Sequence, residues 1–231
     1  MNSPKMQTGQ SCCGFLKTRK EIDECTSFLR QHGLVSNDKC KCKNWDIAHI
    51  IPEIHNGNIL DMGSFGSYVL KNVMLRGIKG EKYGIDLSRQ EPLHGVKYLI
   101  GDLTAVPMAD EFFNYITCLS VIEHEVDLGK FAREIYRLLA LNGKAFVTFD
   151  YWEPKVPATV KMFGLKWQPL DRVAVEYLIA ECAKIGLVVD GKMDWTLGDQ
   201  VIREGYHSPQ RGIRYTFGMV VFRKNRGIKS E

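Results

Sequence analysis

The chain has 231 residues, which is enough for one sizeable globular domain with a short appendage but hardly for two full domains. Apolar residues make up 45% of it and charged residues 25%, a balance that excludes an intrinsically disordered protein. The formal net charge of +4 is too small to indicate a nucleic-acid-binding protein. We find neither an apolar stretch of about 18 residues nor an apolar signal core, so we expect a cytoplasmic protein without a membrane partner.

Five of the seven cysteines lie in the first 42 residues, where they could form disulfides or a zinc site. An odd number of cysteines does not fit a disulfide framework, and a chain of this length does not need one. Cys12-Cys13 and Cys40-Lys41-Cys42 also lack the usual spacer of two to four residues between zinc ligands. A zinc site completed by Cys25 or His49 stays open, but we expect reduced thiols and no bound metal.

The first 43 residues differ in pattern from the rest of the chain. Apolar residues recur with helical spacing over residues 15–31, and Gly33 is a plausible end for that helix. A polar, lysine-rich link follows, and a second stretch of helical periodicity begins at Trp45. We predict a helical cap or tail over residues 1–43 and a main domain over residues 44–231.

The main domain alternates short apolar runs with segments of helical periodicity. This alternation predicts a largely parallel sheet with helices on both faces. The last two strands have no helix between them, which suggests that the final strand is antiparallel. We therefore predict a doubly wound, Rossmann-like α/β fold with a seven-stranded sheet. The predicted strands are 58–62, 83–86, 96–100, 115–119, 145–149, 187–189 and 215–222, and the predicted helices of this domain include 68–75, 127–140 and 171–185.

Ligands of open α/β sheets bind beyond the carboxyl ends of the strands, so the residues after each strand are candidates for a site. The glycine turn at 63–66 follows the first strand and could bring backbone close to a ligand, although an ordinary tight turn explains it as well. Asp86 follows the second strand and can accept both hydroxyl protons of a ribose, or cap a turn. Asp102 follows the third strand and can accept from the amine of adenine, or form a turn.

These residues resemble the class I S-adenosylmethionine-dependent methyltransferases of the small-molecule type, over about residues 45–150. Asp61 and Gly63 match the acidic residue and glycine of the family's first motif. Phe65 and Ser67 stand where glycine is usual, and Gly66 is displaced by one position. The resemblance implies S-adenosyl-L-methionine as cofactor, and the departures at Phe65 and Ser67 put tight binding of that cofactor in question.

Later segments carry the resemblance further. Residues 84–88 look like the ribose motif, residues 101–116 are the strongest match, and residues 119–124 resemble the segment that lines cofactor and acceptor. Some relatives bind magnesium through an acidic residue where this chain has Ser120, so no metal is implied. The implied cofactor-binding residues are Asp61, Gly63, Ser64, Gly66, Asp86, Leu87, Asp102, Leu103 and Ser120.

The resemblance also implies in-line methyl transfer to a small molecule or a sugar or glycan acceptor. A hydroxyl acceptor benefits from a general base, for which His124 and Asp150 are the candidates. His124 could equally cap the helix that follows it, and Asp150 could anchor a loop. Tyr151, Trp152 and Tyr206 are predicted to contact the acceptor, although the first two could also be core aromatic residues.

Two other functions stay open. An NAD(P)-dependent oxidoreductase would share Gly63, Gly66 and Asp86, but it should carry Gly-x-Gly-x-x-Gly, which is absent here. A non-catalytic protein that binds S-adenosylmethionine and acts as a partner of an enzyme is compatible with the unusual glycine turn. The sequence shows no basic groove that would support methylation of nucleic acid.

Overall fold

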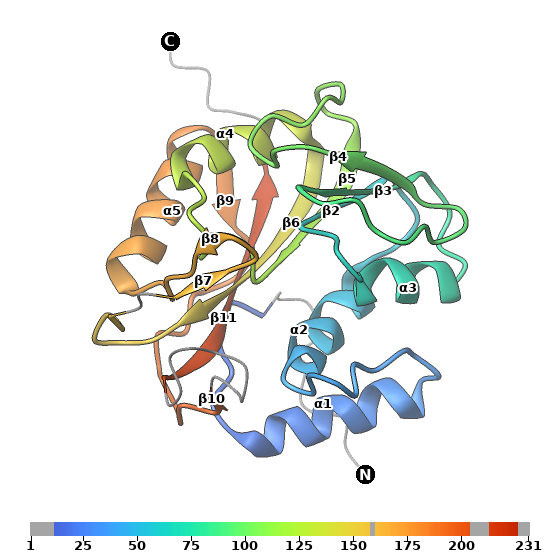
Figure 1. Cartoon of the computed structure of the whole chain (residues 1–231). Helices are drawn as coiled ribbons and strands as arrows, with labels where there is room; N and C mark the ends of the chain where they lie inside the picture. The colour runs from blue at the N-terminus through green and yellow to red at the C-terminus, as the bar shows by residue number, and fades with distance from the viewer. Residues whose placement is uncertain (1–11, 158–159, 204–212, 226–231) are drawn as a thin grey trace.

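The computed structural model describes residues 12–157, 160–203 and 213–225. Its centre is a twisted sheet in the order β1-β11-β6-β5-β2-β3-β4, with β9 and β10 also paired to β11 (Figure 1). Strands β4, β3, β2, β5 and β6 run parallel, and β11 is antiparallel to β6. The strands are β1 Gly14–Phe15, β2 Ile59–Met62, β3 Lys82–Asp86, β4 Lys97–Ile100, β5 Phe113–Leu119, β6 Leu139–Tyr151, β9 Leu187–Val189, β10 Ile202–Arg203 and β11 Arg214–Lys224.

The predicted α/β fold with its antiparallel last strand is confirmed, but the strand count is larger than seven. The described residues contribute nine strands to the sheet, because the two-residue strands β1 and β10 were not predicted. Strands β10, β1 and β9 pair in succession with 214–215, 218–219 and 222–224 of β11. Together they cover an edge that would otherwise expose unpaired backbone groups.

Strand β1 corrects the predicted start of the first helix. Helix α1 spans Arg19–Gln31 rather than 15–31, because a capping box fixes its beginning. The Thr18 hydroxyl accepts a hydrogen bond from the Glu21 amide at 3.3 Å, and Glu21 accepts one from the Lys17 amide at 3.0 Å. The residues before this box are therefore free to extend along β11.

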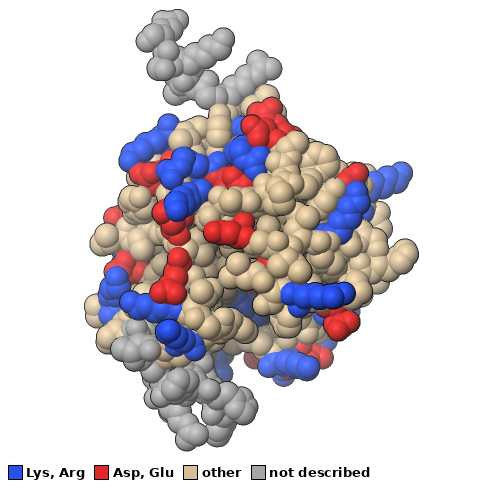
Figure 2. Space-filling model, turned by 45° about the horizontal axis from the view of Figure 1, so that its top comes forward, with Lys and Arg blue, Asp and Glu red and all other residues tan. Residues whose placement is uncertain are grey.

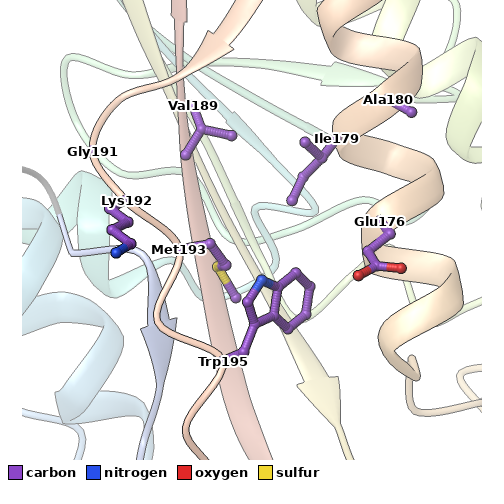
Figure 3. A pocket seen from close by; sticks show the side chains of 8 residues that line it. All are labelled: Glu176, Ile179, Ala180, Val189, Gly191, Lys192, Met193 and Trp195. Carbon is purple, nitrogen blue, oxygen red and sulfur yellow. The ribbon is translucent and has the colours of Figure 1, made fainter.

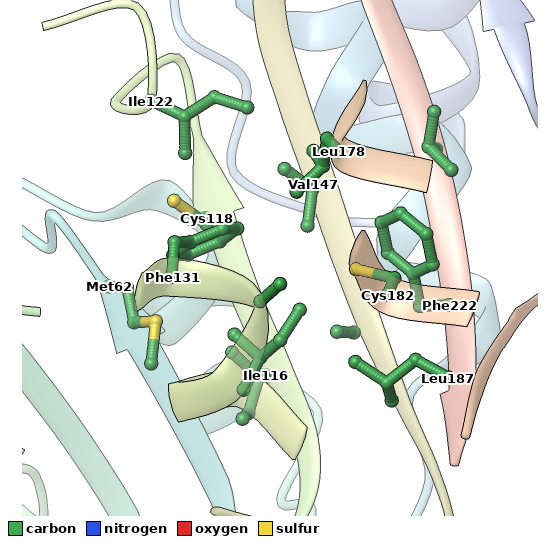
Figure 4. Close-up of a cluster of buried hydrophobic side chains, with 14 of the residues drawn as sticks. Met62, Ile116, Cys118, Ile122, Phe131, Val147, Leu178, Cys182, Leu187 and Phe222 are labelled. Carbon is green, nitrogen blue, oxygen red and sulfur yellow. The ribbon is translucent and has the colours of Figure 1, made fainter. Parts of the chain in front are cut away.

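Two helical layers cover the sheet (Figure 1). Helices α1, α2 (Lys43–Ile50) and α3 (Tyr68–Leu75), with the short 3-10 helix Ile51–Glu53, pack with alternate strand residues such as Ile59 and Phe146. Helices α4 (Leu128–Leu138) and α5 (Arg172–Lys184) pack on the other face, where Met62, Ile116 and Val147 lie (Figure 4). The two cores follow from the alternation of side chains along each strand.

Helix α4 ends earlier than predicted, at Leu138 rather than 140, and β6 begins at once. Lys224 of β11 caps this helix end, because its buried ammonium donates to the carbonyl oxygens of Tyr136 and Leu139 at 2.8 and 2.9 Å. Carbonyl groups in the last turn of a helix need partners of this kind, and a cation there also complements the helix dipole.

A hairpin that was not predicted lies between β6 and α5. Its strands are β7 (Lys161–Met162) and β8 (Leu165–Lys166), too short to give an alternating pattern in the sequence.

On the face drawn in Figure 2, acidic and basic side chains are interspersed, in keeping with the small net charge. None of the helices in the described residues has the length and apolar character that crossing a bilayer requires.

Candidate functional site

The turn after β2 is shaped by two glycines. The amides of Gly63 and Ser64 both donate to the carbonyl oxygen of Ile85 at 2.8 and 3.1 Å, which binds the turn to β3. Gly63 has a φ of +75°, and a Cβ added there would lie 2.2 Å from a methyl group of Val121, so only glycine fits. At Gly66, with φ +68°, an added Cβ would meet no atom within 4 Å. The backbone at Gly66 is therefore open to a ligand.

Asp86 lies at the end of β3 beside this turn. One carboxylate oxygen accepts a hydrogen bond from the amide of Phe65 at 3.2 Å, and the other accepts from the amide of Ser88 at 2.9 Å. The two predicted roles are therefore compatible, because Asp86 caps its own turn and also faces the glycine turn. Each carboxylate oxygen keeps a second lone pair that could accept a ribose hydroxyl.

Asp102 follows β4 at an exposed position and also forms a turn. Its Oδ1 accepts from the amide and the hydroxyl of Thr104, both at 2.8 Å. Three large apolar side chains stand exposed at the ends of β2, β3 and β4, namely Phe65, Leu87 and Ile100, at 65%, 61% and 64%. Exposed apolar groups that adjoin polar groups are typical of ligand sites. Ile100 was missed because it reads as the last residue of a buried strand.

Asp61 lies within β2, one residue before the end of the strand. It is 4% exposed, and its Oδ1 accepts a hydrogen bond at 2.5 Å from the Thr117 hydroxyl, its partner on β5. Burial raises the pKa of Asp61 to about 6. Ser64 is also fully buried and accepts a hydrogen bond from Gln90 at 2.6 Å, whereas Leu103 is half-buried.

Ser120 leads to a buried charged cluster that sequence reasoning missed. Its hydroxyl accepts a hydrogen bond from Lys43, the first residue of α2. The Lys43 ammonium also lies 3.5 Å from Oδ2 of the fully buried Asp46 and 4.1 Å from the centre of the Phe217 ring. Ser120 itself has a φ of +51°, which is uncommon for a residue other than glycine.

Glu123 and Asp150 complete this cluster. Oε1 of Glu123 accepts from the Asp150 amide at 3.2 Å, and Oδ2 of Asp150 accepts from the Trp167 indole at 2.7 Å. Burial raises the pKa of Asp46 to about 7 and, together with the charge of Asp150, raises that of Glu123 well above its ordinary value. Burial opposes the charge of Lys43, but the surrounding carboxylates outweigh it and raise its pKa.

His124 is half-buried at the rim of the same region. Burial, followed by the charge of Lys43, lowers the pKa of His124 to about 4, so the ring is neutral at pH 7. Its Nδ1 is buried without a hydrogen-bond partner among the described residues. The ring forms a T-shaped pair with Phe163, with 5.9 Å between the ring centres.

Two of the predicted acceptor residues, Tyr151 and Trp152, lie against different cores. Tyr151 is 1% exposed and packs on Phe15, with ring centres 4.2 Å apart, in the core beneath α4 and α5. Trp152 is half-buried against the opposite core, and Tyr206 lies outside the described residues. The structure thus unites Asp86 with the glycine turn, and Ser120 with Glu123 and Asp150.

A separate hollow lies where the segment after β9 passes α5 (Figure 3). None of the predicted site residues lines it. Its side chains include Ile179, Val189, Met193 and Trp195, with Glu176 at one side.

The cysteines form no disulfide, and all seven lie in the described residues. Within residues 12–157, 160–203 and 213–225, no three side chains of His, Cys, Asp or Glu are arranged so that they could hold a metal ion.

Comparison with known proteins finds one family model that matches part of the chain. Residues 60–147 match the family model described as a methyltransferase domain. The chain is 22% identical over 147 residues to the uncharacterized methyltransferase YcgJ of Bacillus subtilis, an alignment that covers 57% of this chain and 56% of that relative. The chain thus spans little more than half the length of this curated relative.

Solved structures share the fold. The YcgJ crystal structure aligns with a TM-score of 0.57 at 13% identity, over 79% of this chain and 99% of that one. An S-adenosylmethionine-dependent methyltransferase from Mesorhizobium loti aligns with a TM-score of 0.56 at 11% identity, over 79% and 98%. The [4+2]-cyclase SpnF aligns with a TM-score of 0.54 at 17% identity, over 84% and 85%. Proteins of different activity thus share this architecture.

Replacing Gly63 by alanine tests the close approach of Val121. We expect Gly63→Ala to lower the free energy of unfolding by about 3 kcal/mol, since the methyl group adds a clash to the strain of a positive φ. Gly33→Ala is the matched control, because Gly33 has a φ of +65° without any neighbour within 4 Å. It should cost only about 1 kcal/mol in urea unfolding. In a Val121→Ala background the clash is gone, so Gly63→Ala should lower the free energy of unfolding by no more than Gly33→Ala does. An equally large loss in both backgrounds would contradict this geometry.

Replacing Lys43 by methionine tests the charged cluster. We expect a loss of about 3 kcal/mol at pH 7, because buried carboxylates lose their cation. A carboxyl group whose pKa is raised in the folded state contributes fully to stability below its ordinary pKa. This contribution is lost as the pH rises through the raised pKa, which is about 7 for Asp46. The deficit relative to wild type should therefore be smaller at pH 5 than at pH 8.

The control for this measurement is Lys20→Met, since the Lys20 side chain is 84% exposed. Its effect on the urea midpoint should be small at both pH values. If Lys43→Met lost the same free energy of unfolding relative to wild type at pH 5 and pH 8, the buried carboxylates would not be stabilised by this ammonium.

Proposed function

We propose that the chain is an S-adenosylmethionine-dependent methyltransferase that acts on a small molecule or a sugar or glycan acceptor, and the match of residues 60–147 to a methyltransferase domain supports this. The observation that carries this proposal is the arrangement around Asp86. A carboxylate with lone pairs to spare lies next to an open backbone at Gly66 and to exposed apolar side chains. A ribose with an attached flat base has the complementary polar and apolar surfaces.

The residues present fit S-adenosyl-L-methionine as the cofactor. Asp86 would accept from the ribose hydroxyls, and Asp102, whose Oδ2 lies in an exposed turn, would accept from the adenine amine. Leu87 and Ile100 would cover the faces of the base. The methionine end would extend past Gly63 toward Ser120, where the polar cluster begins.

When bound, S-adenosylmethionine would supply a methyl group on a positively charged sulfur, so that a nucleophile could bond to the methyl carbon in line while the carbon–sulfur bonding pair returns to sulfur. The contribution of the chain is then mainly to position the acceptor for this attack. An attacking hydroxyl becomes strongly acidic as its bond to carbon forms. Even a weakly basic group nearby can therefore receive the proton.

Of the two candidate bases, we assign this role to His124. It is neutral at pH 7 and lies at the rim, where an acceptor can approach. Asp150 is 6% exposed and already accepts from the Trp167 indole, which indicates a positioning role for its carboxylate. His124 passes the proton on to solvent after transfer.

The nucleoside assignment is tested by calorimetric titration with S-adenosylhomocysteine. We expect Asp86→Ala to weaken binding by about 10- to 100-fold, since a hydrogen bond to a charged group is lost, and Asp102→Ala to weaken it less. Asp23→Ala, an exposed change on α1, is the control, and NAD should not bind. Unchanged affinity in both folded variants would place the nucleoside elsewhere.

The base is tested by steady-state release of S-adenosylhomocysteine with a hydroxyl acceptor. We expect His124→Asn to lower kcat by about 100-fold or more. Since the pKa of His124 is about 4, protonation of His124 should lower kcat of the wild-type protein only as the pH falls to about 4. Protonation of His124 should cause no fall in kcat near pH 6.5, the ordinary pKa of histidine. An unchanged kcat in the variant would exclude this role. Binding without turnover on any acceptor would favour a non-catalytic partner protein.

A further inference from the structure

The tip of the β7–β8 hairpin carries a strained and exposed aromatic residue. Phe163 and Gly164 are the two central residues of the turn between the paired Met162 and Leu165, with φ values of +55° and +83°. Turns of this kind favour glycine and asparagine, and a bulky residue with positive φ is an outlier. Phe163 is nevertheless 87% exposed, so its ring gains little from burial to offset the strain.

The hairpin is fixed to the turn that carries His124. The Lys166 amide donates to Glu125 at 3.0 Å, and the Gln168 amide donates to the carbonyl oxygen of Glu123 at 2.9 Å. Between them, the fully buried Trp167 donates to Asp150. Phe163 is thus held in a defined place relative to the end of β6 and the turn after β5.

The ring of Phe163 meets that of His124 at 66°, with 5.9 Å between the ring centres. Since Phe163 is 87% exposed, most of its ring surface is left to solvent. The neighbouring imidazole carries no charge at pH 7, so the pair presents an uncharged aromatic surface. Strain kept at an exposed position beside candidate reactive groups is the pattern expected of a binding residue.

We propose that Phe163 is a stacking platform for a flat ring of the methyl acceptor, held beside His124. Two kinds of acceptor could supply the uncharged ring face that stacks on Phe163, namely an aromatic ring or the apolar face of a pyranose. Aromatic rings favour offset or edge contacts with such a platform. This inference rests on the proposed methyltransferase function, because it is that function which makes the neighbourhood of His124 the acceptor site.

The experiment is saturation-transfer NMR on the full chain with S-adenosylhomocysteine present. One probe set contains flat aromatic compounds, such as 7-hydroxycoumarin and indole, and the other contains methyl glycosides of glucose and galactose. The variants are Phe163→Ala, Phe163→Trp and a control, Tyr177→Ala, which removes a half-exposed aromatic ring from α5. The probe set that binds identifies the source of the ring.

We expect at least one set to bind wild-type protein, and Phe163→Ala to weaken that binding by about tenfold. Phe163→Trp should restore it, and Tyr177→Ala should leave it unchanged. Binding that persists in Phe163→Ala would overturn the inference, as would the failure of both sets to bind wild-type protein. Affinity for S-adenosylhomocysteine should stay within about twofold in every variant.

This last measurement separates the two proposals. If wild-type protein does not bind S-adenosylhomocysteine, the proposed function fails first. If it does bind and the probes ignore Phe163, only the stacking platform fails. Thermal unfolding checks a structural role, since Phe163→Asn suits the positive φ and should leave Tm unchanged or raise it by up to about 4 °C. A fall of more than about 4 °C would show that the ring stabilises the fold.

Discussion

The ammonium group of Lys43, surrounded by Asp46, Glu123 and Asp150, is the interaction on which the arrangement of the site depends. Buried carboxylates without a cation are costly, and a buried cation without carboxylates is equally so. Lys43 begins α2, whereas Glu123 follows β5 and Asp150 is the second-last residue of β6. The cluster therefore fixes the N-terminal helical layer over the carboxyl ends of the parallel strands. The hairpin that carries Phe163 is attached to the same residues.

Much of the sheet could be predicted because parallel strands leave a direct signature in the sequence. The apolar runs at β2, β3 and β5 are buried on both faces, so they stand out from the amphipathic helices between them. The register also places Asp86 opposite Ile100 in the ladder, so that strand ends separated in sequence meet at one edge. That geometry is why Asp86 and Asp102 could be recognised as candidates without any knowledge of the structure.

The parts that escaped prediction depend on contacts between distant residues. Lys43 and Ser120 lie 77 positions apart, and a lysine in a polar link gives no sign that its ammonium is buried. Asp150 and Tyr151 were predicted as site residues together, but adjacent residues of a strand point to opposite faces. Asp150 therefore joins the charged cluster while Tyr151 enters the core under α4 and α5.

The central claim is that a nucleoside-bearing cofactor binds at the carboxyl edge of β2, β3 and β4. A crystal structure of the protein with S-adenosylhomocysteine tests it most directly. The account predicts the ribose on the carboxylate of Asp86, the adenine between Leu87 and Ile100, and the sulfur near Ser120. A ligand bound elsewhere, such as in the hollow beside Trp195, would contradict it.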